Sequence, residues 1–205
     1  MILRTETVEQ AVDGVETRTF FKEVLMTPGP HPLGMVRKRL PPPAPTRGAV
    51  ILVHGYAQNR YTWHSSKRSF VNYLAQEGWD VFNVDLRGHG RSRRFGAPFP
   101  RTMDDYIRED LPLFVREAKD LSGQDQVFLV GHSMGGLISY FAGATRLREQ
   151  VAGIVSVGSP YVFGQGSALL FGLREVAAAV RWTGLLDANP ALPLRLVGRH
   201  LNRRK

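Results

Sequence analysis

One serine has neighbours that suit a nucleophile. Residues 131–135 are Gly-His-Ser-Met-Gly, directly after the apolar run 127–130 and before a segment with helical periodicity. Glycines on both sides of Ser133 permit a sharp strand-to-helix turn, in which the serine takes an unfavourable backbone conformation and its Oγ stands clear of the chain. A helix beginning at Gly135 would point its first amides toward the same place. The pattern predicts nucleophilic catalysis, and the alternative is a serine that merely caps the helix.

The segments around this turn alternate as expected of an α/β protein. Short apolar runs are separated by longer segments whose apolar residues recur every three or four positions. Gly78 and Gly123 stand after two of the helical segments, where a left-handed C-cap is favoured. We therefore predict an α/β fold, a mostly parallel sheet with helices on both faces. The predicted strands are 49–55, 79–86, 126–133 and 151–160, and the predicted helices are 65–78, 103–123 and 135–150.

The N-terminal part of the chain predicts an additional hairpin. Segments 18–27 and 33–40 have strand composition, and the Pro-Gly-Pro-His sequence between them has turn composition. We expect the two strands to be antiparallel to each other. The 205 residues then form a single domain, with its core over 18–160 and a less regular segment over 161–205.

Three motifs at the ends of predicted strands resemble those of the α/β-hydrolase superfamily. They are ILVHGYAQNRYTW at 51–63, VDLRGHGRS at 84–92 and VGHSMGG at 130–136, so the resemblance covers roughly residues 18–160. It implies a serine esterase or lipase-like hydrolase that cleaves carboxylic esters, lipids or acylglycerols among them, through an acyl-enzyme on Ser133. A polyester synthase of the same superfamily uses cysteine as its nucleophile, and this chain contains no cysteine.

The resemblance also implies which groups surround the nucleophile. The backbone amides of Met134, after the serine, and of Tyr56, after the His-Gly pair, are the expected oxyanion donors. His89 is expected to pack within its loop, and His132 to point away from the serine. Structural roles in the motifs are expected for His54, which shapes the oxyanion loop by hydrogen bonding, and for Gly55, Gly131, Gly135 and Gly136.

The acid and the base of a catalytic triad are harder to place. In the superfamily they follow the serine at the ends of later strands, the acid before the histidine. After Ser133 the only aspartate is Asp187 and the only histidine is His200, and Gly158-Ser159-Pro160 offers no carboxylate. Either Asp187 is the acid and His200 is the base, or the chain stops before the last strands, within a cap region that starts near 161. The alternative function is then a truncated or non-catalytic α/β-hydrolase-like protein.

Composition argues against several other classes of protein. Without cysteine there is no disulfide, thiolate metal site or cysteine nucleophile. The net charge of +9 includes a basic C-terminus without interleaved aromatic residues, so we expect no nucleic-acid partner. No metal-ligand spacing or phosphate-binding loop occurs, so we expect no metal and no cofactor. A signal peptide and an 18-residue apolar run are both missing, which predicts a cytoplasmic protein without integral membrane association.

A small-molecule ester is thus the expected partner. The sheet edge at strand 151–158 suggests a second partner, namely another copy of the chain. If later strands are missing, that edge would present unpaired backbone groups flanked by apolar side chains, which favours self-association of the chain.

Overall fold

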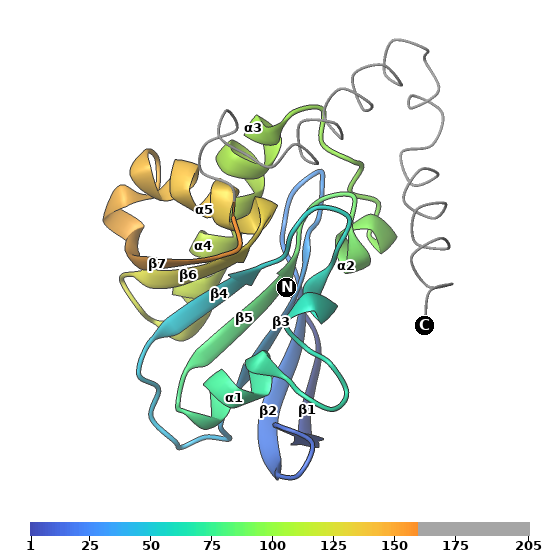
Figure 1. Ribbon diagram of the computed structural model, residues 1–205, viewed down its shortest axis with the longest axis vertical. Coiled ribbons are helices and arrows are strands. Elements are labelled where there is room, and N and C mark those ends of the chain that lie inside the picture. The colour runs from blue at the N-terminus through green and yellow to red at the C-terminus, as the bar shows by residue number, and fades with distance from the viewer. Residues whose placement is uncertain (160–205) are drawn as a thin grey trace. The chain divides into compact units, whose positions relative to one another are not determined.

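The fold is built on one mixed β-sheet (Figure 1). The computed structural model describes residues 1–159, and within them seven strands pair in the order β1-β2-β3-β5-β4-β6-β7. Strands β5, β4, β6 and β7 are parallel to one another, whereas β1, β2 and β3 run antiparallel to their neighbours. This confirms the predicted α/β class. The strands are β1 (Ile2–Ala11), β2 (Thr17–Met26), β3 (Gly34–Arg39), β4 (Ala49–Val53), β5 (Asp80–Asp85), β6 (Val127–His132) and β7 (Val151–Val157).

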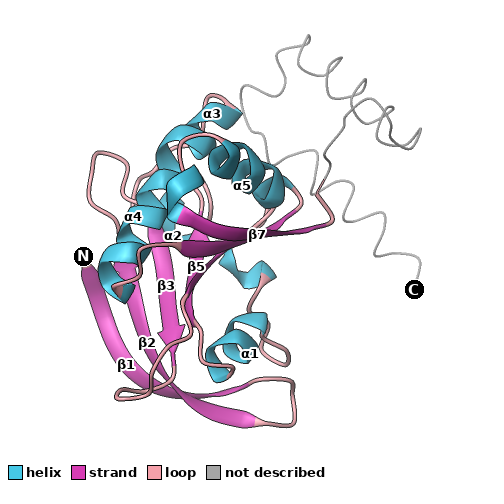
Figure 2. Cartoon of the chain, turned by 90° about the vertical axis from the view of Figure 1, so that its left-hand side faces the viewer, coloured by secondary structure: helices cyan, strands magenta, loops and turns pink. Residues whose placement is uncertain are grey.

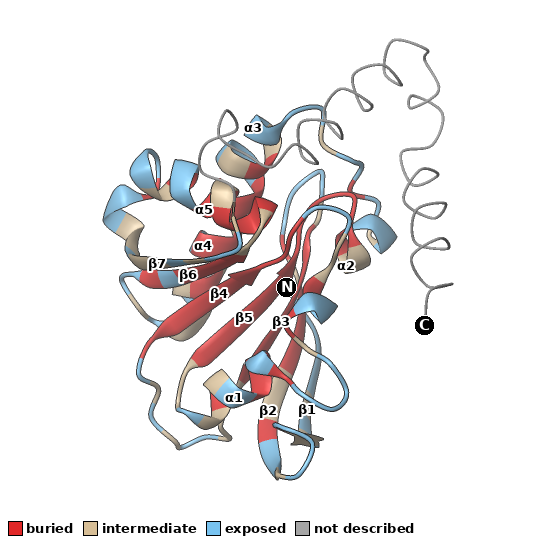
Figure 3. Cartoon of the chain, viewed as in Figure 1, coloured by how far each residue is buried: buried red, intermediate tan, exposed pale blue. Residues whose placement is uncertain are grey.

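Helices cover both faces of the sheet (Figure 2). Side chains of α4 and α5 share a core with Ile51 and Val53 of β4, whereas α1 shares a second core with Val50 and Leu52. Alternate residues of β4 therefore face opposite layers, and the central strands β4 and β5 are buried throughout (Figure 3). The helices are α1 (Phe70–Gln76), α2 (Gly90–Arg94), α3 (Met103–Asp105), α4 (Leu111–Ser122) and α5 (Met134–Ala144), with a π-helical turn at Tyr106–Asp110 and 3₁₀ turns at Arg60–Thr62 and Arg148–Gln150.

Two predicted helices are shorter than the sequence suggests. The helix predicted over 65–78 begins only at Phe70, because Ser69 is its N-cap and accepts a hydrogen bond from the Asn72 amide at 3.0 Å. The helix predicted over 135–150 ends at Ala144, and the remaining residues form a turn and a separate 3₁₀ element. Residues 65–69 contain no apolar side chain to bury, whereas beyond Ala144 the buried Leu147 continues the apolar spacing although the backbone has left the helix.

The sheet also contains a strand that the sequence pattern does not reveal. The predicted hairpin is present as β2 and β3, and β1 adds to it as a third antiparallel strand. Most of β1 is exposed or half-buried, so it lacks the apolar alternation of a core strand. The turn before β2 does carry a local signal, since the Asp13 carboxylate accepts hydrogen bonds from the Val15 and Glu16 amides at 3.0 Å each.

Strand β7 lies at one edge of the described sheet. Among residues 1–159 it pairs with β6 alone. Its Val155 and Val157 side chains are 54% and 44% exposed, and they border an apolar groove of about 410 Å³ that Trp79 and Phe128 also line. The edge is therefore apolar, as expected, and self-association through it stays a prediction. No helix in the described part of the chain is both long and apolar enough to cross a membrane.

Candidate active site

The three motifs meet at one edge of the sheet. Strands β4, β5 and β6 are adjacent and parallel, so their carboxyl ends lie side by side. The loop beginning at His54 follows β4, the loop beginning at Leu86 follows β5, and Ser133 follows β6. In open α/β sheets this edge is where ligands bind.

Ser133 occupies the turn between β6 and α5. Its backbone has φ 51° and ψ −118°, a left-handed conformation that costs a residue with a side chain roughly 1–3 kcal/mol. Its amide donates to the Val157 carbonyl at 2.9 Å, which ties the turn to β7. Ser133 stands at the N-cap position, yet its hydroxyl makes no capping hydrogen bond with the described residues. The helix-cap alternative therefore does not account for this serine, and the backbone has the form expected of a nucleophile elbow.

The glycines around Ser133 are required by close backbone contacts. A Cβ on Gly131 would overlap the backbone of Gly135 and Gly136, which lie in the first turn of α5. A Cβ on Gly135 would overlap the Val53 carbonyl and come within 2.6 Å of the His54 carbonyl oxygen. These overlaps involve main-chain atoms, which cannot rotate away. The small residues thus let β6, α5 and the end of β4 approach one another at the elbow.

His54 fixes the loop that follows β4. The Leu86 amide donates to His54 Nε2 at 3.1 Å, so the ring proton resides on Nδ1, which donates to the Gly55 carbonyl at 2.8 Å. Burial lowers the pKa of His54 to about 4, and the ring is therefore neutral at pH 7. With both nitrogens engaged, His54 holds the two loops together and is not available as a base.

Asp85, at the end of β5, also connects the two loops. One carboxylate oxygen accepts from the Arg60 amide at 2.8 Å, and the other accepts from the Arg60 guanidinium at 2.7 Å and from the Arg91 amide at 2.8 Å. The carboxylate is fully buried, and a Cβ on Gly90 would overlap it. Charge-assisted hydrogen bonds of this kind give the loops fixed positions relative to the sheet.

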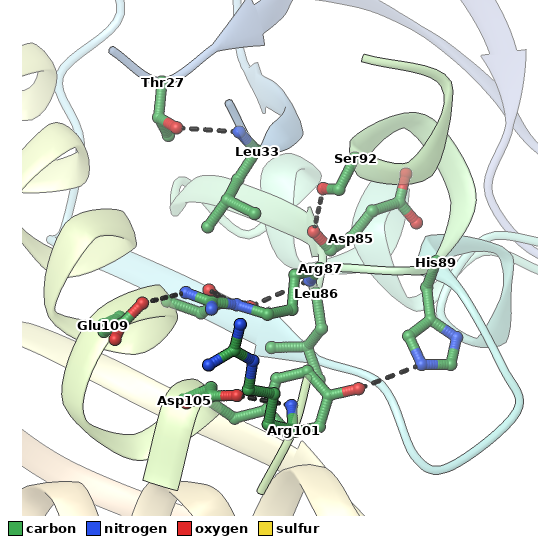
Figure 4. A network of polar contacts seen from close by, with 12 residues as sticks. Thr27, Leu33, Asp85, Leu86, Arg87, His89, Ser92, Arg101, Asp105 and Glu109 are labelled. Atoms are coloured by element: carbon green, nitrogen blue, oxygen red, sulfur yellow. Dashed lines mark hydrogen bonds and ion pairs between the residues drawn. The ribbon is translucent and has the colours of Figure 1, made fainter. Parts of the chain in front are cut away.

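The loop after β5 rests on a second polar network (Figure 4). Arg87 donates to Asp110 from its backbone amide at 2.8 Å and from Nε at 2.7 Å, and to Glu109 at 2.6 Å. Burial raises the pKa of Asp110 to about 6, against the opposing effect of Arg87. His89 Nε2 lies 3.2 Å from Tyr106 Oη, and its buried ring packs on that of His54. The His89 ring also packs against Phe99 of its own loop, so its contacts lie both within that loop and with neighbouring segments.

The two expected oxyanion donors lie on neighbouring loops. The Met134 amide is the first of α5, where no intrahelical acceptor exists, and no acceptor for it or for the Tyr56 amide is found among residues 1–159. The backbone of Gly55 and that of His132 are close, since a Cβ on Gly55 would lie 3.2 Å from the His132 carbonyl oxygen. Convergence of both amides on Ser133 Oγ stays a prediction.

Gln58 is a site residue that the sequence analysis missed. Its Oε1 accepts from the Gly55 amide at 3.0 Å and lies 3.0 Å from His132 Nδ1. Its position in the motif gives no local signal, because the contact joins two segments that are far apart in the chain.

A base for Ser133 is not found in the described part of the chain. Asp187 and His200 lie outside residues 1–159. The described histidines at the site are engaged elsewhere, since His54 bonds to Gly55 and Leu86, and no hydrogen bond joins a histidine of residues 1–159 to Ser133. The position after β7 carries Ser159 rather than a carboxylate.

The family assignment agrees with this geometry. The family model for the alpha/beta hydrolase fold matches residues 48–193, which include all three strand-end motifs. The chain belongs to the alpha/beta hydrolase fold family. An esterase from Pyrococcus furiosus has the same fold, with a TM-score of 0.50 and 22% identity over 77% of this chain and 52% of that structure.

Two curated relatives of this alpha/beta hydrolase fold protein have different activities in their names. Epoxide hydrolase B of Mycobacterium tuberculosis is 30% identical over 120 residues, which are 58% of this chain and 31% of the relative. Lipase member K of Mus musculus is 32% identical over 125 residues, which are 57% of this chain and 30% of the relative. The chain thus spans about a third of the length of either relative, so neither name transfers its activity.

Proposed function

We propose that this chain carries the nucleophile and the oxyanion hole of a serine hydrolase that cleaves carboxylic esters. The observation that carries the proposal is the strained, positive-φ backbone of Ser133. Its hydroxyl makes no capping hydrogen bond with the described residues, and the first amides of α5 lie directly after it in the chain. Backbone strain of this kind persists only where surrounding contacts maintain it. Here the contacts are the close main-chain packing at Gly131 and Gly135, which leaves no space for a Cβ at either position. The relative named lipase supports extending the proposal to lipid esters.

The reaction we propose is a two-step acyl transfer. Ser133 Oγ attacks the ester carbonyl carbon while its proton passes to a base, and the Met134 and Tyr56 amides stabilise the oxyanion that forms. Collapse of this intermediate expels the alcohol, which takes the proton from the base. Water then attacks the acyl-enzyme, and the carboxylic acid leaves as Ser133 regains its proton. His200, with Asp187 as its acid partner, is the proposed base.

The nucleophile favours ester over epoxide chemistry. An acyl group on serine is an ester, which water can hydrolyse, so the enzyme is regenerated. Opening of an epoxide by Ser133 Oγ would instead form an ether, which water does not cleave under mild conditions. One of the two relatives is named epoxide hydrolase, but a serine at the elbow suits acyl transfer and would be consumed by an epoxide.

Comparison of three chains tests this function. We would assay p-nitrophenyl butyrate hydrolysis by the 205-residue chain, by Ser133→Ala, and by Ser66→Ala, which replaces an exposed serine outside the motifs. Fluorophosphonate labelling followed by peptide mass spectrometry would identify the reactive serine, and styrene oxide would serve as the epoxide substrate. We expect ester turnover and labelling that depend on Ser133 alone. Turnover that survives Ser133→Ala would refute the proposed nucleophile, and a folded wild-type chain without turnover or labelling would favour a non-catalytic protein.

A further inference from the structure

The side chain of Gln58 joins the loop carrying the Tyr56 amide to the nucleophile turn by hydrogen bonds, and the Trp63 ring packs edge-on against the His132 ring nearby. Gln58 Oε1 lies 3.0 Å from the Gly55 amide nitrogen, on its own loop, and 3.0 Å from His132 Nδ1, on the residue before Ser133. The Gly55 amide can only donate, so the side-chain atom facing it is the oxygen. His132 Nδ1 must therefore carry a proton and donate to the same oxygen.

Three hydrogen bonds to Gly55 together set the direction of the Tyr56 amide. In a trans peptide the carbonyl of one residue and the N–H of the next point in opposite directions. The Gly55 carbonyl accepts from the buried ring of His54 at 2.8 Å and from the Gln58 backbone amide at 3.4 Å, so the Tyr56 N–H must point away from these two donors. Gln58 holds the preceding peptide through the Gly55 amide. These bonds fix the peptide planes before and after Gly55. Glycine, the most flexible residue, is least able to keep the two planes fixed without outside contacts.

We propose that Gln58 is a positioning residue, which sets the distance between the oxyanion loop and the nucleophile turn through the bonds from Gly55 and His132. This inference rests on the proposed function. The loop itself is under strain, because Ala57 has φ 55°, and it would relax if the connection were removed. An oxyanion donor acts only within a narrow range of positions, so a loosened loop weakens the transition state more than substrate binding.

Three substitutions separate the bonds of Gln58, and a fourth serves as the control. Gln58→Met keeps the length of the side chain and removes the oxygen. His132→Leu removes the second donor, whereas His132→Asn places an amide N–H close to the position of Nδ1 and restores it. Gln126→Met is the matched control, because Gln126 is an exposed glutamine at the other end of β6.

The first measurement is independent of catalysis. Amide hydrogen exchange by NMR should show the protection of the Gly55 amide falling about 10-fold or more in Gln58→Met. The ¹⁵N shifts of the His132 ring should report the Nδ1-protonated form in the wild type. Unchanged Gly55 exchange in a folded Gln58→Met chain would overturn the proposal, whether or not the chain is an enzyme.

The second measurement is Ser133-dependent ester hydrolysis. We expect kcat to fall about 10- to 100-fold in Gln58→Met and in His132→Leu with little change in KM, and His132→Asn to recover most of the loss. Equal loss in His132→Asn and His132→Leu would contradict the donor role, as would a kcat unaffected by Gln58→Met. If the wild type has no Ser133-dependent turnover, the proposed function fails, and the exchange data alone decide whether Gln58 fixes the loop.

Discussion

Lys38 is a buried ammonium group whose cost should be measurable as a function of pH. It lies in β3, is 2% exposed, and donates to the side-chain oxygens of Gln10 and Asn72. Burial, with a smaller contribution from Lys22, lowers the pKa of Lys38 from 10.5 to about 7. The folded chain therefore binds this proton more weakly than the unfolded chain does.

The sign of the effect follows from proton binding. Between pH 7 and pH 10.5 the unfolded chain keeps the Lys38 proton while the folded chain loses it, so the free energy of unfolding rises with pH across this window. A pKa difference of about 3.5, at about 1.36 kcal/mol for each pKa unit, gives a ceiling of about 5 kcal/mol. The oxygens of Gln10 and Asn72 favour the charged form, so we expect a rise of about 2–4 kcal/mol.

The substitution Lys38→Met removes this titration and keeps the length of the side chain. The wild type should gain about 2–4 kcal/mol relative to Lys38→Met between pH 6 and pH 10. The amide oxygens left without a donor lower the stability of the variant by a nearly constant amount, which does not affect this slope. Urea unfolding followed by circular dichroism at five pH values would measure it, with the exposed Lys67→Met as control. Parallel pH profiles for wild type and Lys38→Met would show that Lys38 stays protonated in the folded chain, and the argument would be wrong.

Two further predictions concern the elbow and the sheet edge. Gly135→Ala should lower the free energy of unfolding by about 1–3 kcal/mol or more, because the added Cβ would meet main-chain atoms. Gly143→Ala, in the same helix, is the control. It should change the free energy of unfolding by less than about 1 kcal/mol, because its Cβ would meet only the end of the Ile154 side chain. Similar losses in the two variants, measured by urea unfolding, would contradict the close approach at the elbow. Val155→Lys should shift the chain toward monomer in size-exclusion chromatography with light scattering, since it places a charge on the apolar edge of β7. An oligomer distribution identical to the wild type would rule out this edge as the contact.

The sequence predicts the parts of the fold that depend on local patterns. The apolar run of β4 is continuous because this strand is buried on both faces, and the glycines near Ser133 mark a turn that no larger residue fits. Strand β1 gives no such signal, since its stability comes from pairing with β2 rather than from burial. Contacts between distant segments are also invisible to a periodic pattern. Gln58 and His132 are 74 positions apart, and only the order of the strands brings them together.

The elbow is held by atoms that do not belong to the Ser133 side chain. Its backbone is fixed by the bond to Val157 and by the close packing of glycines, while Oγ takes no part in any hydrogen bond among the described residues. The contacts that hold the turn are therefore independent of the side chain proposed as the nucleophile. A different side chain at this position, such as a carboxylate, would take the same half-buried place without disturbing the bonds that hold the turn. In this architecture a change of reaction class can begin with a single substitution at the position of Ser133. This gives a physical reason why hydrolases with different reactions share the fold.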